Sequence, residues 1–430
     1  MTPTHLTPAQ AGAPTSANPS SSLAPWSLFA ALIAAAGLPI YIHAPNFYVK
    51  EYGLSLASLG GTLALLRLID VVQDPLLGYL AERGHATRRF WVAFSSFCMA
   101  AAMVGLFGVT PPFAPLLWFA LTLTLLFSAF SFLTICFYAE GVGRAARIGP
   151  TGHLRLAGWR ETGSLIGISA ASVAPVALAS LTDHPFTAFA YGFAVLALLA
   201  TLAMRAEWGR TTAMPADTSP FATFRPALSD PLARRLLLIA LLNAAPVAVT
   251  STLFLFFVES RLDAPNAAGP LLLLFFLAAA ASTPVWSRMA TTYGPKPTLM
   301  AGMTLAIAAF LGAATLTTGQ TTAFALICAA SGAALGADMT LLPAIFAHRL
   351  AAIGKGGESA AFGLWSFVSK LSLALAAATL LPTLQWQGFQ PGTPNTPQAL
   401  TTLTILYALL PCALKVAAIA LISRTPIPKD

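Results

Sequence analysis

The sequence predicts an all-α membrane protein with twelve transmembrane helices in two six-helix halves. The 430-residue chain is 57% hydrophobic and only 9% charged, whereas soluble proteins carry about 25% charged residues. Its apolar runs come close to the ~20 residues that a membrane-spanning helix requires. The longest polar joint lies between the sixth and seventh runs. Six helices, a long linker and six more helices are typical of membrane proteins built from two similar halves around a site at the midplane.

Each apolar run is predicted to form one helix, and polar or Pro- and Gly-rich joints separate the runs. Residues 1–24, rich in Thr, Pro, Ala and Ser, are expected to form a disordered cytoplasmic tail. Residues 205–233 are expected to form a cytoplasmic linker and residues 425–430 a short C-terminal tail. The N-terminal half, 25–204, is predicted to hold helices over 26–48, 57–80, 90–110, 115–138, 158–181 and 186–204, and the C-terminal half, 234–424, over 234–258, 268–289, 297–317, 321–348, 359–384 and 399–423.

The distribution of Lys and Arg predicts the orientation in the membrane. With both termini in the cytoplasm, most of the 23 Lys and Arg residues lie in cytoplasmic loops or at the adjoining helix ends. Lys50 and Arg261 fall on the outer side, and Arg67, Lys370 and Lys415 lie within predicted spans. Because cytoplasmic loops collect positive charge, the sequence predicts a multi-pass protein of a bacterial-type inner membrane with cytoplasmic termini.

Several function classes lack their signature residues. The net charge of +8 comes with no basic face or motif for nucleic acid. The four cysteines fall within apolar runs without metal-ligand spacing, so we expect no metal centre, no cofactor and no disulfide. No HExxH, partnered GxSxG or phosphate loop predicts an enzyme. We expect a monomer whose partners are a small-molecule solute and the lipid bilayer, and a membrane-embedded enzyme or a scramblase is the less favoured interpretation.

The stretch LLRLIDVVQDPLLGYLAER, residues 65–83, places charged side chains inside a predicted span. Arg67, Asp70 and Asp74 are three and four residues apart, so they share one helix face. Two carboxylates this close repel each other, and a bound Na⁺ or a proton relieves the repulsion. Gln73 can add an amide oxygen. The spacing predicts a cation site; the alternative is a structural salt-bridge network in which Arg67 pairs with Asp70.

Other ionisable residues fall within or beside predicted spans, where such groups usually mark ion or solute pathways. Lys370, in the eleventh span, can neutralise the carboxylates when no cation is bound. Arg160, next to Glu161, can reach a polar or anionic solute or, equally, extend to the cytoplasmic interface. Asp338 can pair with a basic group or act in gating, and Lys415 is expected to extend to the interface without a functional role.

The first span carries polar side chains and two prolines, in LPIYIHAPNFYVKEYG. Pro39 and Pro45 are expected to kink the helix and to free backbone groups that can line a cavity. His43 can titrate near neutral pH, although the more common role of such a residue is that of a hydrogen-bonded packing residue. Tyr41 and Asn46 can donate hydrogen bonds to a solute at this level.

Four segments together resemble one known family. RLIDVVQDPLLGYLAER contains an Arg, an Asp three residues later, an Asp-Pro four residues further on and then a Gly, as Arg67, Asp70, Asp74-Pro75 and Gly78. This pattern resembles the second-helix signature of the glycoside–pentoside–hexuronide:cation symporters, the melibiose-permease-like branch of the major facilitator superfamily. FGLWSFVSKLSLA resembles the eleventh-helix signature, GADMTLLPAIFAH the tenth helix and STPVWSRMATTYGPKPT the eighth-to-ninth loop. The resemblance covers the chain from about residue 26.

The resemblance implies the major facilitator fold and symport of a sugar- or glycoside-like solute with Na⁺, Li⁺ or H⁺ by alternating access. The implied cation-binding residues are Asp70, Asp74, Gln73 and Ser131, and the implied coupling residues are Lys370 and Arg67. The resemblance implies Arg160 and Tyr138 as solute contacts, and we expect Thr134, Tyr41, Asn46 and Trp365 to complete the solute site. Glu82, Arg83, Arg88 and Arg89 resemble the basic second-to-third loop of the superfamily and are expected to latch the outward-facing state; Asp338 is a further candidate gating residue.

The chain departs from the family pattern where that pattern grips sugar hydroxyls. Thr134 stands where the family has a carboxylate in the fourth helix, and Glu51 is too near the outer end of the first helix to act at the sugar site. Gln73 replaces an Asn that is common between the two aspartates. A galactoside substrate is therefore in doubt, and an amphiphile, a lysolipid or another non-sugar organic solute is the alternative.

Overall fold

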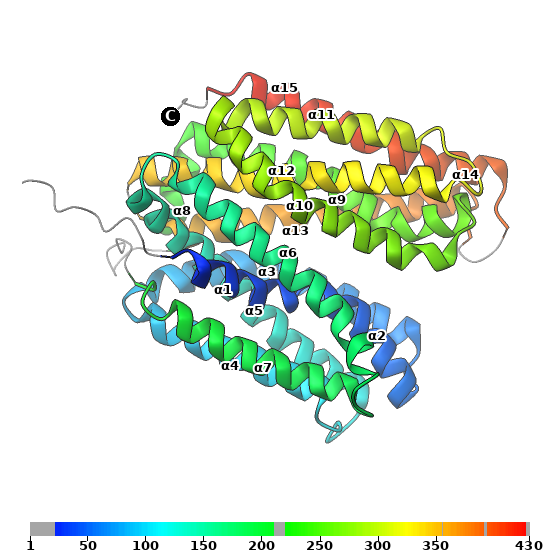
Figure 1. Ribbon diagram of the computed structural model, residues 1–430, viewed down its shortest axis with the longest axis horizontal. Helices are drawn as coiled ribbons and strands as arrows, with labels where there is room; N and C mark the ends of the chain where they lie inside the picture. The colour runs from blue at the N-terminus through cyan, green and yellow to red at the C-terminus, as the bar shows by residue number, and fades with distance from the viewer. Residues whose placement is uncertain (1–21, 210–219, 355, 391–393, 427–430) are drawn as a thin grey trace, which may run out of the picture.

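The computed structural model describes residues 22–209, 220–354, 356–390 and 394–426. These ranges are helical and contain no β-strand. Most of the expected N-terminal tail, up to residue 21, lies outside the described residues, as do 210–219 of the expected linker and 427–430 of the expected C-terminal tail. The ribbon consists of two lobes of roughly parallel helices, one from each half of the chain (Figure 1).

Two helices, rather than one kinked helix, form the first predicted span. α1 covers Ala24–Ala35 and α2 covers Leu38–Tyr52. Gly37, just before α2, has a non-helical backbone. A proline occupies the first turn of α2, where its missing N–H would have no helical partner in any case. Pro45 lies inside α2 without ending it.

The other spans of the N-terminal half are single helices close to their predicted bounds. The fourth exceeds its prediction most, because it continues to Ile148. Pro75 lies inside the second span without ending it, which neighbouring helices in a membrane protein make tolerable. A short 3₁₀ turn, His85–Thr87, follows that span. The helices are α3 (Leu56–Arg83), α4 (Arg88–Phe107), α5 (Pro115–Ile148), α6 (Gly152–Leu178) and α7 (Pro185–Met204).

The C-terminal half repeats this plan after a short helix that the sequence did not predict, α8 (Pro220–Ser229), within the expected linker. Two of its spans contain a π-helical turn, Phe257–Arg261 after α9 and Ile405–Leu409 between α14 and α15. A 3₁₀ turn, Pro265–Ala267, leads into α10. The helices are α9 (Pro231–Phe256), α10 (Ala268–Tyr293), α11 (Pro295–Ala313), α12 (Thr321–Ile353), α13 (Glu358–Trp386), α14 (Pro397–Thr404) and α15 (Leu410–Ser423).

Nine helical segments in the described ranges are long and apolar enough to cross a membrane. The remaining three spans are the α1–α2 pair, α3 and α6. α3 and α6 carry the charged residues that the sequence placed in the candidate site. With these three, the structure has the twelve predicted spans.

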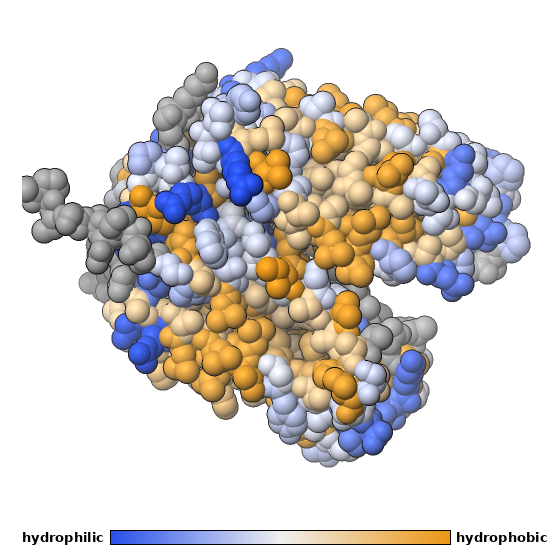
Figure 2. Space-filling view, viewed as in Figure 1, coloured by the Kyte–Doolittle hydropathy of each residue, from blue (hydrophilic) through white to orange (hydrophobic). Residues whose placement is uncertain are grey.

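The two lobes meet mainly through α3 against α13 and α6 against α10. At the end of the molecule that carries α8, side chains of both halves are in contact; we call this the closed end. At the opposite end, which carries α2 and α14, the space-filling view shows a hollow between the lobes (Figure 2). The first residues of α1 and the last residues of α15 both lie at the closed end (Figure 1).

Candidate cation and solute site

Lys370 reaches from α13 of the C-terminal half to side chains of the N-terminal half. Its Nζ lies 3.0 Å from Asp74 Oδ1 on α3 and donates a hydrogen bond to Ser131 Oγ on α5 at 2.7 Å. The same nitrogen lies 3.9 Å from Asp70 Oδ2. One turn before Lys370, the Ser366 hydroxyl also donates to Asp74. The structure thus brings together Asp70, Asp74, Ser131 and Lys370 from three helices.

Burial makes the charge of this cluster consequential. Asp74 is fully buried and Asp70 is 6% exposed. Two buried carboxylates repel each other, and a charge in a low-dielectric region is tolerated only where partners compensate it. Lys370 supplies one such partner, and a proton or a small cation can supply another. Arg67 is the other charged residue on this part of α3, and its side chain lies outside the described part of the structure.

Gln73 joins the cluster through its amide nitrogen. Its Nε2 donates to Asp70 Oδ1 at 2.7 Å, while its Oε1 accepts a hydrogen bond from Ser128 at 2.9 Å. In this arrangement the amide oxygen that the sequence suggested as a cation ligand is already engaged by a hydroxyl. Gln73 therefore holds Asp70 in place and links it to α5.

Arg160 lies inside the protein rather than at its surface. It is 6% exposed, and its Nε donates to Glu161 Oε1 at 2.9 Å. Its guanidinium lies 3.8 Å from the centre of the Tyr138 ring, a cation–π arrangement. The Tyr138 hydroxyl donates to the same Glu161 oxygen at 3.3 Å. The interfacial interpretation of Arg160 is wrong, because the α5–α6 contact encloses its charged end.

The other expected solute contacts differ in what the structure shows. Trp365 packs against Phe346, with 4.9 Å between ring centres. The Thr134 hydroxyl donates to the Phe130 carbonyl of its own helix at 2.7 Å. The side chains of Tyr41 and Asn46 lie outside the described part of the structure. On the same helix α2, His43 is hydrogen-bonded to the Ser172 carbonyl at 2.9 Å and Tyr48 to the Leu106 carbonyl at 3.1 Å, as packing residues are.

A cavity of about 410 Å³ touches both halves next to this cluster. Tyr138 of the N-terminal half and Trp365, Ser369, Asn243 and Asp338 of the C-terminal half contribute aromatic and polar groups to its lining. Most of the other lining residues are aliphatic. A cavity of this size is typical of a small-molecule site, in which a few polar groups interrupt an apolar wall.

Asp338 has a basic partner, as the sequence suggested, although the sequence did not indicate which residue it would be. It forms an ion pair with Lys415 of α15, and Lys415 is 2% exposed. The expectation that Lys415 extends to the membrane interface is therefore wrong. The pair lies between α12 and α15 of the C-terminal half, whereas the contacts that close the molecule lie elsewhere.

Those contacts involve two of the expected gating residues. The Glu82 carboxylate accepts hydrogen bonds from the backbone N–H groups of Gly357 at 3.3 Å and Ser359 at 3.1 Å, so it caps the start of α13 from the other half. Arg88 donates to Ser359 Oγ at 2.7 Å and to Glu140 at 3.2 Å. Glu82 and Arg88 thus tie α3 and α4 to α13 at the closed end.

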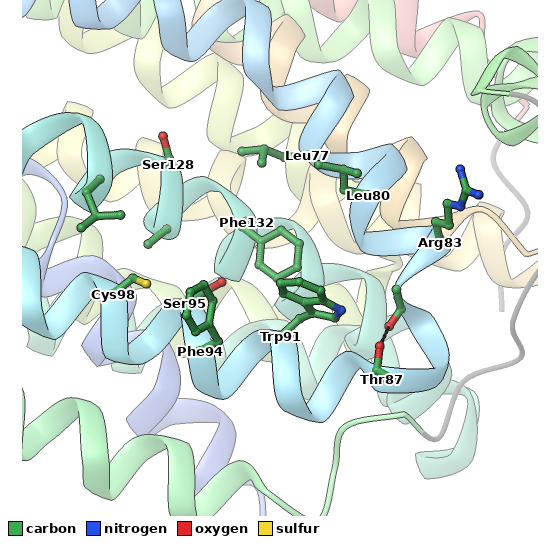
Figure 3. Close-up of a pocket in the computed structure, with 13 residues that line it drawn as sticks. Leu77, Leu80, Arg83, Thr87, Trp91, Phe94, Ser95, Cys98, Ser128 and Phe132 are labelled. Atoms are coloured by element: carbon green, nitrogen blue, oxygen red, sulfur yellow. Dashed lines mark hydrogen bonds between the residues drawn. The ribbon is translucent and has the colours of Figure 1, made fainter. Parts of the chain in front are cut away.

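The other two basic residues of this loop stay at the surface. Arg83 and Arg89 are exposed, and Arg83 donates to the Tyr79 hydroxyl of its own helix at 3.2 Å. Arg83 lies at one end of a second cavity of about 520 Å³ between α3, α4 and α5 (Figure 3). Trp91, Phe94 and Phe132 give this cavity an aromatic wall (Figure 3).

Sequence reasoning missed several residues of these clusters. Ser366 lies four residues before Lys370, so helical spacing could have placed both on one face. Glu161 was noted only as a neighbour of Arg160. Ser359 and Glu140 could not have been found, because their roles depend on helices far apart in the sequence.

Two solved structures of bacterial transporters have a similar fold. A bacterial homologue of the iron transporter ferroportin, in an outward-facing state with soaked iron, superposes with a TM-score of 0.68 at 14% identity, over 94% of this chain and all of that chain. The Escherichia coli fucose:proton symporter FucP superposes with a TM-score of 0.66 at 14% identity, over 94% of this chain and 98% of that one. At this identity the likeness shows the fold, which is the predicted one.

Sequence comparison adds the family. The inner membrane symporter YicJ of Escherichia coli strain K12 is 25% identical over 236 residues, which are 51% of this chain and 50% of YicJ, so the match spans about half of that relative's length. The profile described as MFS/sugar transport protein matches residues 27–429. The match confirms the resemblance seen in the second- and eleventh-helix motifs and the expectation of a transporter rather than an enzyme. The chain is a member of the MFS/sugar transport protein family.

Proposed function

We propose that this sugar-type transporter is a symporter that couples a small organic solute, sugar- or glycoside-like, to Na⁺ or H⁺. The observation that carries the proposal is the position of Lys370, whose ammonium lies 3.0 Å from Asp74 and 3.9 Å from Asp70. A lysine of one half thereby occupies the place where a cation would bind on the other half. The ion pair between Lys370 and Asp74 therefore both compensates a buried charge and joins the two halves.

This geometry supports a mechanism for coupling. When Na⁺ or a proton binds at Asp70 and Asp74, it competes with Lys370 for the two carboxylates and weakens this link between α13 and α3. Binding then changes the relative free energies of the conformations, because a ligand shifts an equilibrium by its differential affinity for the two states. The solute binds in the cavity beside Tyr138 of α5 and Trp365 of α13. Its binding therefore acts on the contact between α5 and α13, to which the hydrogen bond from Lys370 to Ser131 also belongs.

The direction of opening follows from the proposed orientation. With the termini in the cytoplasm, the closed end is cytoplasmic and the hollow in Figure 2 faces outward. Glu82 and Arg88 then hold the outward-facing state, as the sequence led us to expect. Rocking of the two halves would break these contacts and close the hollow.

A second candidate solute is an amphiphile such as a lysolipid. The observation that favours it is the aromatic cavity of Figure 3, where Trp91 and Phe94 are 43% and 49% exposed on the outside of the helix bundle. Ser128 lines this cavity and also donates to Gln73, which holds Asp70. An acyl chain in this cavity would lie against Ser128, which hydrogen bonds through Gln73 connect to Asp70 of the cation site.

The decisive experiment is thermal unfolding of the purified protein in detergent against Na⁺, Li⁺ and pH at constant ionic strength. A ligand that binds the folded state raises its stability by RT ln(1 + [L]/Kd). We expect a saturable, ion-specific rise that Asp70→Asn abolishes and that Asp183→Asn, which changes an exposed loop carboxylate, leaves intact. A rise with Na⁺ identifies a sodium site, and a rise only on acidification identifies a proton site.

Transport itself is measured in proteoliposomes that contain a stated panel of labelled solutes, with and without the identified ion gradient. Gradient-driven accumulation that Asp70→Asn lacks is the expected result. An unfolding temperature that responds equally in the wild type and Asp70→Asn would instead return the cluster to the salt-bridge alternative.

A further inference from the structure

Three polar side chains from three helices meet inside the C-terminal half; we call them the polar triad. Lys415 of α15 forms an ion pair with Asp338 of α12. The same ammonium donates to Asn243 Oδ1 of α9 at 2.6 Å. All three residues are more than nine-tenths buried, and Lys415 is 2% exposed. None of the three is part of the proposed cation site.

A purely structural role accounts poorly for the polar triad. Buried ion pairs contribute little net stability, and apolar side chains of similar volume often serve as well or better. Asp338 Oδ1 is buried and has no hydrogen-bond partner among the described residues. Leaving a buried acceptor unsatisfied costs about 1–3 kcal/mol, and more for a charged group. Such an atom in a native protein calls for an explanation, and a ligand that donates to it is the direct one.

The position of Asp338 supplies that explanation. Asp338 and Asn243 line the 410 Å³ cavity that Tyr138 and Trp365 also line. The atom without a partner therefore belongs to a residue in the wall of the proposed solute site. Lys415 stands behind Asp338 and holds its other oxygen. Asp338 is a candidate solute contact, and Lys415 and Asn243 are positioning residues.

The charge of the polar triad selects the chemistry of the ligand. Lys415 already neutralises Asp338, so a cationic ligand would meet the repulsion of a buried ammonium. An anionic ligand would meet a free acceptor rather than a donor. A neutral hydroxyl group donates a hydrogen bond without either penalty, and the aromatic rings of Tyr138 and Trp365 suit the apolar face of a sugar ring.

Resting on the proposed function, we infer that Asp338 binds a hydroxyl group of a neutral polyhydroxylated solute from the C-terminal half. The N-terminal half contributes Tyr138 to the same cavity, and the Arg160 guanidinium lies over that ring. A hydroxyl-rich solute can donate to Asp338 and pack against Tyr138. The solute then contacts both halves, as transport by alternating access requires.

The test compares Asp338→Asn with Asp183→Asn, which changes an exposed loop carboxylate outside the lining of this cavity. The probes are the methyl glycosides of D-glucose, D-galactose and D-xylose, with lysophosphatidylcholine as the amphiphile. Their apparent affinities are read from unfolding temperatures in the presence of the coupling ion. We expect at least one glycoside to stabilise the wild type and Asp183→Asn, with about ten- to hundredfold weaker affinity in Asp338→Asn, as loss of a hydrogen bond to a charged group predicts.

Singly deoxygenated forms of the responding glycoside locate the hydroxyl. One of them should bind the wild type about tenfold or more weakly and should lose no further affinity in Asp338→Asn, because the two changes remove the same contact. Should Asp338→Asn fail to fold, the double variant Asp338→Leu/Lys415→Met removes both charges with apolar side chains and is judged by the same criterion.

Two results overturn the inference: glycoside affinity in Asp338→Asn within about twofold of the wild type, or a wild type that responds to ions and to lysophosphatidylcholine but to no glycoside. The ion response tests the proposed function separately. A glycoside effect that depends on Asp338, in a protein without any ion response, would contradict the proposed coupling and support the polar triad as a solute site.

Discussion

The Lys370 ammonium satisfies a fully buried carboxylate of another helix and a serine hydroxyl of a third. At the scale of the residue, the strength of this contact depends on burial rather than on distance. An ion pair at the surface contributes about 0–1 kcal/mol. Removing one partner of a buried pair costs about 3–5 kcal/mol, because the other charge stays buried. Asp74 is in the second situation.

Lys370→Ala should therefore destabilise the protein at neutral pH and abolish ion-driven accumulation of solute. Na⁺ or acid should restore more of the unfolding temperature in this variant than in the wild type, since either neutralises the carboxylate that the lysine has left. Unfolding temperatures in an ion and pH series measure this. Lys50→Ala, which removes an exposed lysine of α2, serves as the control; an identical response of the two variants would contradict the role of Lys370.

At the scale of the element, α3 and α13 approach each other through glycines. A Cβ atom on Gly78 would lie 2.9 Å from the Ser359 carbonyl oxygen and 3.0 Å from Gly363 Cα. These neighbours are backbone atoms of a helix, which cannot turn aside as a flexible side chain can. The close approach also sets the short reach from Lys370 to Asp74.

Gly78→Ala should cost about 1–3 kcal/mol, as expected for inserting a methyl group into a packed contact. Gly60→Ala in the same helix, where no atom lies within 4 Å of the added Cβ, should be neutral or slightly stabilising because Ala favours helix. Thermal unfolding of both variants is the measurement. Equal effects at the two positions would mean that α3 and α13 separate more easily than their packing indicates.

A second element-scale contact joins α9 to α12. Asp230 caps α9 through the Ala233 N–H at 2.7 Å and accepts a hydrogen bond from Arg349 of α12 at 3.0 Å. The hydrogen bond from Arg349, together with the cap, lowers the pKa of Asp230 below its usual value. Because the folded-state pKa is the lower one, the stabilisation is present at neutral pH and is lost as the pH falls through that value.

Asp230→Asn should keep the cap, since Asn is a good N-cap residue, but lose the ion pair. We expect its unfolding temperature to be lower than that of the wild type at pH 7, and the gap to close as the pH falls below 3.8, the usual pKa of an aspartate. Asp183→Asn gives the baseline for an exposed carboxylate. A gap that stays constant with pH would show that the charge on Asp230 contributes nothing.

At the scale of the whole molecule, contacts between the halves gather at the closed end. Glu82 caps α13, Arg88 donates to Ser359, and the rings of His153 and His348 meet edge to face with 5.4 Å between centres. The opposite end is hollowed (Figure 2). These few contacts therefore contribute much of the free-energy difference between the conformation that is closed at this end and the one that is closed at the opposite end.

Glu82→Ala should shift that balance towards opening of the closed end, because it leaves the first N–H groups of α13 without their carboxylate. Spin labels on Thr87→Cys and Tyr293→Cys, two exposed sites on opposite halves, would report longer distances by double electron–electron resonance. Glu51→Ala, at the exposed end of α2, should leave the distances unchanged. Unaltered distances in Glu82→Ala would remove Glu82 from the gate.

The sequence by itself determined the number of spans, most of their bounds to within a few residues and the common face of Asp70 and Asp74, but not the end of the fourth span at Ile148. These features follow from local physics: helix length against membrane thickness and 3.6 residues per turn. The break at Gly37 could not be predicted from the sequence, because it depends on the backbone conformation of a single residue. The helix α8 could not be predicted because it lies in the polar linker.

Only the tertiary structure decided which charges meet. Lys370 lies nearly three hundred residues from Asp74 along the chain. The partner of Asp338 is Lys415, which was expected from the sequence to extend to the membrane interface. Glu82 accepts hydrogen bonds from backbone N–H groups of α13, and no pattern of residue types predicts such a contact. Pairing of this kind depends on how helices pack, and close packing is a property of all side chains at an interface together.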